Sequence, residues 1–129
     1  MWVATESSVE QREALLYNWY RKQLKERLPE LLEKWEQVIG VQVSGWGVKR
    51  MKTKWGTCNI TARRIWLNLE LIKKPVHCQE YIIVHELVHL LERLHNDRFS
   101  ALIDQYMPLW RQYRQELNSA PLGHDEWAE

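Results

Sequence analysis

The chain has 129 residues, a net charge of +1 and 27% charged residues, which excludes both a highly charged disordered segment and a strongly basic nucleic-acid protein. Hydrophobic residues make up 45%, enough for one domain with a real core. Two cysteines, Cys58 and Cys78, are too few for a disulfide framework and fit a reducing compartment. Residues 1–11 lack the apolar segment of a signal peptide, and no apolar run is long enough to span a bilayer. We therefore expect a cytoplasmic protein with no membrane partner.

The first third of the chain shows helical periodicity over residues 7–39, because apolar residues recur every three or four positions. Ser7 and Glu10 can form a capping box at its start. Pro29 is expected to kink this stretch or to begin a second helix. Gly40 is the expected stop.

Between residues 41 and 69 the pattern changes to the two-residue alternation of strands. The alternating residues are Val41, Val43, Met51, Thr53, Trp55, Ile65, Leu67 and Leu69. Residues 59–63 read as a turn between two antiparallel strands. The expected fold class is therefore α+β, with a small antiparallel sheet.

Helical patterns return after Pro75. Residues 81–91 are apolar on nearly all sides, which predicts a buried helix. Asn96 or Asp97 can cap another helix, whose inner face carries Phe99, Leu102, Ile103 and Tyr106. Pro108 opens a last helical stretch that runs through Leu117. Residues 119–129 form a C-terminal tail without a clear period.

The buried helix carries the motif His85-Glu86-Leu87-Val88-His89, which has the HExxH pattern. Residues at i and i+4 share one helical face, so both imidazoles can reach the same metal ion. Glu86 lies on the adjoining flank, where it can take a proton from a metal-bound water. Without such a role, burying two histidines and a glutamate on so apolar a helix would cost folding free energy. The motif predicts a single Zn²⁺ ion with Glu86 as catalytic base.

A catalytic zinc normally has three protein ligands and an open fourth position, and His95 is the best third ligand. In an unbroken helix His95 would lie about 9 Å along the axis from His89, too far for a shared ion. We therefore expect the helix to end near residues 91–94 and the chain to turn back. Asn96 tolerates turn conformations and suits this position.

Other ligand sets compete with His95. Glu92 lies three residues after His89 on the same face, but three ligands from one straight helix rarely converge tetrahedrally. His77 and His124 have no ligand spacing and are expected to be ordinary exposed histidines. Cys58 and Cys78 are expected to be inert thiols.

The motif and its surroundings resemble a known family. HExxH at residues 85–89, followed by His95-Asn96 and Phe99, is similar to the YgjP-like metallopeptidases, which are related to the SprT-like and WLM families. The segment Met51-Lys52-Thr53-Lys54-Trp55-Gly56-Thr57-Cys58-Asn59 and Leu67-Asn68 also match that group's pattern. The similarity extends over residues 13–127. Thr57 stands where the group usually has Ser, which keeps the hydroxyl.

The resemblance implies zinc at His85, His89 and His95, with Glu86 as base, and a zincin-like fold in which a small sheet packs on the HExxH helix with flanking helices. It implies one metallopeptidase domain over residues 1–129. Members often have an additional N-terminal β-rich region, so the chain is expected to be a shortened form. The same histidine spacing occurs in metzincins, which have Gly at the position of Glu92.

Residues outside the motif suggest how a substrate is held. A strand through residues 52–57 is expected to border the cleft and to align a peptide by β-augmentation, with Gly56 allowing close backbone approach. The alternation of Arg50, Lys52 and Lys54 predicts one basic strand face. We expect a solvated face balanced by the acidic helices, and a basic rim that attracts an acidic substrate or nucleic acid is the alternative. The candidate oxyanion donors are Tyr106, Lys54 and Arg50. The candidate partners of the imidazoles are Asn68, Glu70 and Asp104.

Three functions compete. Zinc-dependent hydrolysis of a peptide or protein substrate leads. A metal-dependent endoribonuclease is the second, because a ribosome-maturation family uses the same His-x3-His-x5-His spacing; that family typically lacks a glutamate after the first histidine, so Glu86 favours the peptidase. A binding module stabilised by zinc, with Glu92 or Cys58 closing the coordination, is the third.

Overall fold

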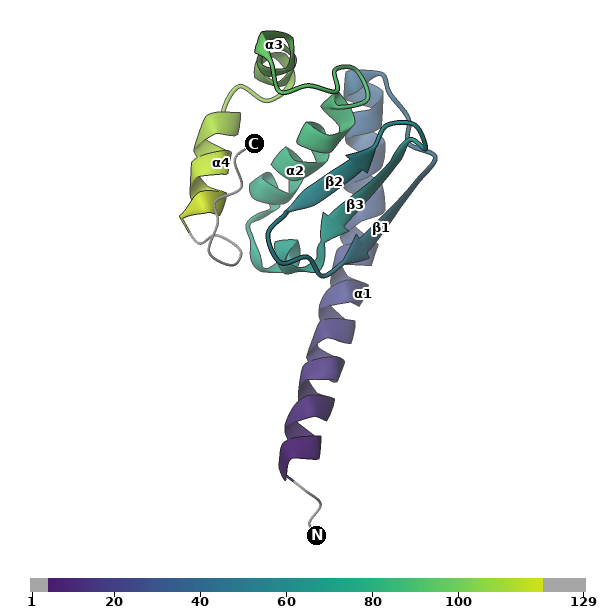
Figure 1. The fold of residues 1–129 in the computed structure, drawn as a ribbon, viewed down its shortest axis with the longest axis vertical. Helices are drawn as coiled ribbons and strands as arrows, with labels where there is room; N and C mark the ends of the chain where they lie inside the picture. The colour runs from purple at the N-terminus through teal and green to yellow at the C-terminus, as the bar shows by residue number, and fades with distance from the viewer. Residues whose placement is uncertain (1–4, 120–129) are drawn as a thin grey trace.

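The computed structural model describes residues 5–119 of the chain. Its elements in order are α1 (Thr5–Ile39), β1 (Gly45–Lys49), β2 (Gly56–Asn59), β3 (Arg64–Asn68), the 3₁₀ helix η1 (Leu69–Lys73), α2 (Val76–Val88), α3 (Asp97–Tyr106) and α4 (Trp110–Asn118). The fold is α+β, as expected, with α2 lying between the small sheet on one side and α4 on the other (Figure 1).

Helix α1 packs on the rest of the molecule mainly with its C-terminal half, and Tyr17 and Tyr20 extend this contact towards its N-terminus. The buried side chains there recur every three or four residues: Leu24, Leu28, Leu32, Trp35 and Ile39. The N-terminal half projects beyond the body (Figure 1) and leaves Leu15 and Trp19 more than half exposed. The helix ends at Gly40, as predicted, where a φ of +82° suits glycine and the Gly40 amide donates to the Glu36 carbonyl at 2.9 Å.

Two outcomes were predicted for Pro29, a kink or the start of a second helix. The second is wrong, because one helix runs from Thr5 to Ile39 with Pro29 inside it. Proline removes one helical hydrogen bond at this point. Leu28 and Leu32, on either side of it, are both buried in the core. Packing of this continuous apolar stripe outweighs the local cost of proline.

The sheet is mixed rather than purely antiparallel, which corrects the prediction. Its strand order is β1-β3-β2, with β1 parallel to β3 and β2 antiparallel to β3. The predicted turn at 59–63 does connect an antiparallel pair, with Arg63 at a φ of 54° and the Asn59 side chain accepting from the Ala62 amide at 3.0 Å. The parallel pair arises because the chain crosses the sheet after β1, so β3 enters between the first two strands.

The segment that links β1 to β2 is a loop, although its residues alternate like a strand. Two carbonyls of this loop, at Met51 and Lys54, accept from the side-chain amide of Asn68 at 2.8 and 2.7 Å. Trp55 anchors the loop and is almost fully buried. The prediction of a strand through residues 52–57 is therefore wrong before Gly56, and Arg50, Lys52 and Lys54 do not share a strand face.

Asn68 should contribute strongly to stability because it is fully buried and holds the loop from the centre of the sheet. Its side chain makes the two bonds to the loop and accepts a third from the Glu70 amide at 3.0 Å. We expect Asn68→Ala to lower the free energy of unfolding by about 2–4 kcal/mol, from three lost hydrogen bonds. Urea denaturation measures this. Asn59→Ala, which removes one exposed bond in the same sheet, is the control, and an equal loss in both variants would contradict this role.

Helix α2 forms the centre of the molecule, and ten of its thirteen residues are buried. The helix packs against β2 and β3 on one side, while α1 and α4 also contact it. The rings of Tyr81 and Trp110 stack at a centroid distance of 6.3 Å, which joins α2 to the start of α4. The polar side chains of His85 and Glu86, near the end of α2, are therefore buried inside the protein.

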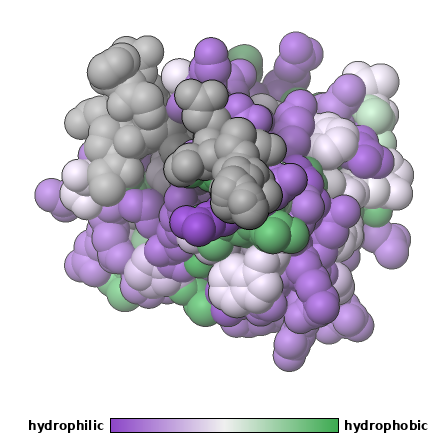
Figure 2. All heavy atoms as spheres, turned by 90° about the horizontal axis from the view of Figure 1, so that it is seen from below, coloured by the Kyte–Doolittle hydropathy of each residue, from purple (hydrophilic) through white to green (hydrophobic). Residues whose placement is uncertain are grey.

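Seen from below, most of the visible described surface is hydrophilic, with small separate apolar areas (Figure 2). Within residues 5–119, none of the helices combines the length and the apolar character needed to cross a membrane.

Candidate metal centre

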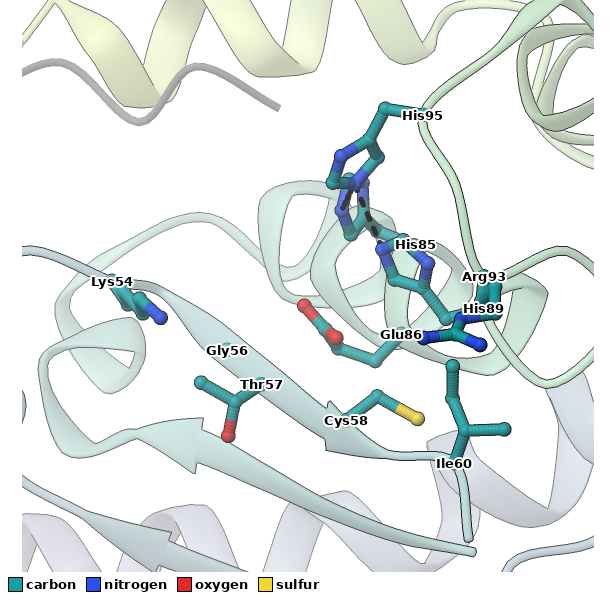
Figure 3. Close-up of a pocket in the computed structure, with 10 residues that line it drawn as sticks. All are labelled: Lys54, Gly56, Thr57, Cys58, Ile60, His85, Glu86, His89, Arg93 and His95. Atoms are coloured by element: carbon teal, nitrogen blue, oxygen red, sulfur yellow. Dashed lines mark hydrogen bonds between the residues drawn. The ribbon is translucent and has the colours of Figure 1, made fainter.

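His85, Glu86 and His89 lie at the C-terminal end of α2, and all three are buried. His85 and His89 are one helical turn apart, and their ring centroids are 4.9 Å apart. Figure 3 shows Glu86 on the flank of the helix that faces β2. The predicted arrangement of the motif on one buried helix is confirmed.

The chain reverses immediately after this helix. α2 ends at Val88, three residues before the expected window of 91–94, and the backbone tightens through bonds from Leu90 to Leu87 and from Leu91 to Val88. Asn96 caps α3, accepting from the Phe99 amide at 3.0 Å. Among the described residues only Arg63 and Gly40 have positive φ values, so this reversal needs no glycine at the position of Glu92.

The reversal brings His95 to the other two histidines. Its Nε2 atom lies 3.3 Å from Nε2 of His85 and 2.9 Å from Nε2 of His89 (Figure 3). Two nitrogens bound tetrahedrally to one zinc ion at about 2.0–2.1 Å are about 3.3–3.4 Å apart. His95 is therefore within a few tenths of an ångström of the distances needed to share an ion with either helix histidine, and one ligand atom from each of the three residues lies within 4.8 Å of the others, close enough to hold a metal ion.

Phe99 supports this group in a way that the sequence pattern did not indicate. The centroid of its ring lies 5.0, 4.7 and 5.0 Å from those of His85, His89 and His95. Its backbone amide is held by the cap residue Asn96. Phe99 was expected as an inner-face residue of its helix and as part of the family pattern, without a stated role at the site. The structure places it as the apolar support that limits how the three imidazoles can rotate.

The electrostatic environment suits metal binding and proton transfer. Burial, followed by the neighbouring histidines, lowers the pKa of His85 well below its ordinary value, and burial also lowers the pKa of His89. Both rings are therefore neutral near pH 7 and can offer a lone pair to a cation. Burial raises the pKa of Glu86 to about 8, with Lys54 acting in the opposite direction. A carboxyl poised near neutrality can both accept and release a proton.

The group opens into a cavity of about 360 Å³ between α2 and β2. Gly56, Thr57 and Cys58 of β2 form one wall, and Lys54 and Arg93 flank the opening (Figure 3). Sequence reasoning missed Arg93, whose only signal was its place in the turn after the motif. Of the three candidate oxyanion donors, Lys54 lines this cavity. Arg50 instead lies over the ring of Tyr17, and Tyr106 packs against the core.

The competing ligands do not belong to the histidine group, although Cys58 lines the same cavity. The carboxylate of Glu92 accepts from the side chain of Asn96 at 3.0 Å and thereby braces the loop before α3. Cys58 is half-buried, and burial raises the pKa of its thiol to about 11. Cys78 lies outside this cavity, as does His77. His124 lies outside the described residues.

The three residues proposed to hold the imidazoles make other contacts. Asn68 holds the loop, Glu70 pairs with Lys73 at 2.9 Å, and Asp104 accepts from Trp110 and Arg111. The bond found on the ring of His89 instead goes from Nδ1 to the backbone carbonyl of Glu92, at 3.3 Å. A backbone acceptor of this kind carries no sequence signal, which is why side-chain reasoning did not find it.

Comparison with known proteins now adds to this geometry. The family model of the YgjP-like metallopeptidase domain matches residues 2–120. The crystal structure of the metallopeptidase zymogen abylysin from Pyrococcus abyssi is similar, with a TM-score of 0.65 and 19% identity, covering 70% of this chain and 91% of that one. The zymogen jannalysin from Methanocaldococcus jannaschii has a TM-score of 0.60 and 18% identity, covering 68% and 90%. A search of curated protein sequences gives no match.

Proposed function

Because the chain belongs to the YgjP-like metallopeptidase family, we propose that it hydrolyses peptide bonds with a zinc ion held by His85, His89 and His95 and with Glu86 as the general base. The observation that carries this proposal is the convergence of three imidazoles, with Nε2 of His95 3.3 Å from that of His85 and 2.9 Å from that of His89, beside a buried carboxyl in an open cavity. Neutral imidazoles favour zinc over the hard cations that prefer oxygen ligands.

In this proposal a bound zinc ion supplies Lewis acidity and lowers the pKa of water towards neutrality. Glu86 accepts the proton of the attacking water and passes it to the leaving amine. Lys54, at the mouth of the cavity, offers an ammonium group for the negative charge that develops on the carbonyl oxygen. Thr57 and Cys58 place an edge strand along the cavity, where an extended peptide can align.

The experiment that tests this function uses the pure chain, stripped of metal with a chelator and then given Zn²⁺. We expect casein to be cleaved only after zinc is restored, while a structured RNA stays intact. Cleavage of RNA without cleavage of casein would favour the endoribonuclease instead. Tight zinc binding with neither activity would favour the binding module stabilised by zinc.

Gly56 is expected to be needed for the position of Glu86. A Cβ atom at Gly56 would lie 2.9 Å from Cγ2 of Ile82 and 3.1 Å from Oε2 of Glu86, so the missing side chain leaves room for α2 rather than for a substrate backbone. We expect Gly56→Ala to lower kcat/KM about ten- to hundredfold by displacing the carboxylate. Steady-state cleavage of a fluorogenic peptide measures this effect.

The matched control is Gly45→Ala in the same sheet. Its Cβ atom would meet only the flexible end of Arg64, with Nη1 at 2.7 Å, which can move aside. Gly45→Ala should therefore keep normal kcat/KM and a normal melting temperature. Equal activity in the two alanine variants would show that Gly56 does not set the position of Glu86.

A further inference from the structure

A second cluster of metal-binding side chains lies at the other end of α2. His77 and Cys78 belong to its first turn, and Glu116 belongs to the last turn of α4. Since His77 precedes His85 by eight residues, the cluster is about 12 Å along the helix axis from the first centre. Figure 1 shows that the start of α2 and the end of α4 lie side by side, which brings these residues together.

Two of the three side chains are already bonded. Nε2 of His77 lies 2.9 Å from Oε1 of Glu116, and the thiol of Cys78 lies near this pair. One ligand atom from each residue lies within 4.8 Å of the others. The ring of His77 packs on Tyr113 at a centroid distance of 4.8 Å, which helps to orient its Nε2 towards Glu116. The arrangement therefore joins two helices through one nitrogen, one sulfur and one oxygen.

This set of donor atoms selects a class of ligand. Sulfur and imidazole nitrogen favour a borderline-soft divalent cation, and zinc accepts sulfur at about 2.3 Å together with nitrogen and oxygen at about 2.0–2.2 Å. Ligand atoms around such an ion lie about 3.3–3.7 Å apart, so shifts of about 1 Å close the site. The side chains of His77 and Glu116 are 44% and 45% exposed, which leaves them free to make these shifts.

A nucleophilic role for the thiol is the alternative, and the surroundings of Cys78 disfavour it. Its side chain is fully buried, and burial followed by the charge of Glu116 raises its pKa to about 12, with Lys74 acting in the opposite direction. Little thiolate exists near pH 7 under these conditions. A bound cation would displace the thiol proton and neutralise both the sulfur and the carboxylate.

We propose that His77, Cys78 and Glu116 form a second metal site, which takes Zn²⁺ or a similar divalent cation and clamps the end of α4 to the start of α2. Water completes the coordination from the exposed side. The clamp is structural, because it holds the two helices whose contact includes the stacked rings of Tyr81 and Trp110. Tyr81 in turn lies edge-on to His85, with ring centroids 6.0 Å apart. The clamp therefore helps to fix the position of His85 through Tyr81.

The test is a titration of the metal-free full chain with Co²⁺, whose bond to a thiolate produces a charge-transfer absorption band in the near ultraviolet. We expect two equivalents to bind and the band to develop with one of them. Cys78→Ala should lose the band and one equivalent. Cys58→Ala is the matched control, because Cys58 is the other cysteine of the chain and lines the first cavity, and it should keep both.

Glu116→Gln provides a second variant at an exposed position, where the fold tolerates the change. It should lower the Co²⁺ affinity of the site that produces the band by about tenfold or more. A band that disappears in Cys58→Ala and remains in Cys78→Ala would overturn the proposal, because the thiolate would then belong to the first cavity. Absence of the band in the unmodified chain would overturn it as well. None of these outcomes depends on peptidase activity.

Discussion

Glu86→Gln should lose almost all peptidase turnover while zinc remains bound. Glutamine has the size of glutamate but cannot accept a proton, and removal of a general base costs about 10²- to 10⁴-fold in rate. The side chain is buried between α2 and Gly56, so an isosteric change leaves the cavity walls in place. Measurements of kcat and of zinc content by atomic absorption test the two parts separately.

The same variant should melt no lower than the unmodified chain when both are free of metal. Burial raises the folded-state pKa of Glu86 from 4.5 to about 8, so the unfolded chain ionises first as the pH rises. This carboxyl therefore reduces the stability of the metal-free protein progressively between about pH 4.5 and pH 8, and glutamine removes that loss. Glu92→Gln is the control for the loss of a carboxylate outside the cavity, because the amide oxygen of the new glutamine can still accept from Asn96. Near-normal turnover in Glu86→Gln would refute the proposed mechanism.

His95→Ala should lose the first metal and, with it, the activity. With two imidazoles left on α2, the zinc affinity of this centre should fall about a hundredfold or more, because loss of a direct ligand costs at least as much as loss of a supporting residue. Competition with a chromogenic chelator measures the affinity. The comparison is made in a Cys78→Ala background, so that the proposed second site does not contribute.

The fold should survive this substitution because His95 is exposed and lies in a loop. Leu94→Ala, at the neighbouring position, is 61% exposed in the parent chain and controls for disturbance of the loop. It should keep both metal affinity and activity. If His95→Ala bound zinc as tightly as Leu94→Ala, the third ligand would have to come from another residue.

The centre of the candidate site could be predicted from sequence because its spacing is local. His85 and His89 share a face in any α-helix, and the apolar residues around them require that helix to be buried. Asn96 as a cap and Gly40 as a stop were predictable for the same reason, since each acts through backbone atoms a few residues away. The existence of helices α2, α3 and α4 was predictable from the spacing of their apolar residues.

The errors lie where distant residues override a local pattern. Residues 51–55 alternate like a strand, yet they form a loop because the side chain of Asn68, 14 to 17 positions later, binds their carbonyls. Pro29 reads as a break, yet α1 continues because its apolar stripe is buried on both sides of the proline. In neither case does the local sequence indicate which distant residues will make the contact.

A buried HExxH helix, a returning chain with His95 and the family resemblance were predictable from residues 85–99, because they depend on helical geometry and on short spacings. The mixed order of the sheet, the contact between Gly56 and Glu86, and the approach of Cys78 to Glu116 across two helices became visible in the folded structure alone. Such contacts depend on which surfaces pack together, and packing sums many weak interactions between residues far apart in the chain.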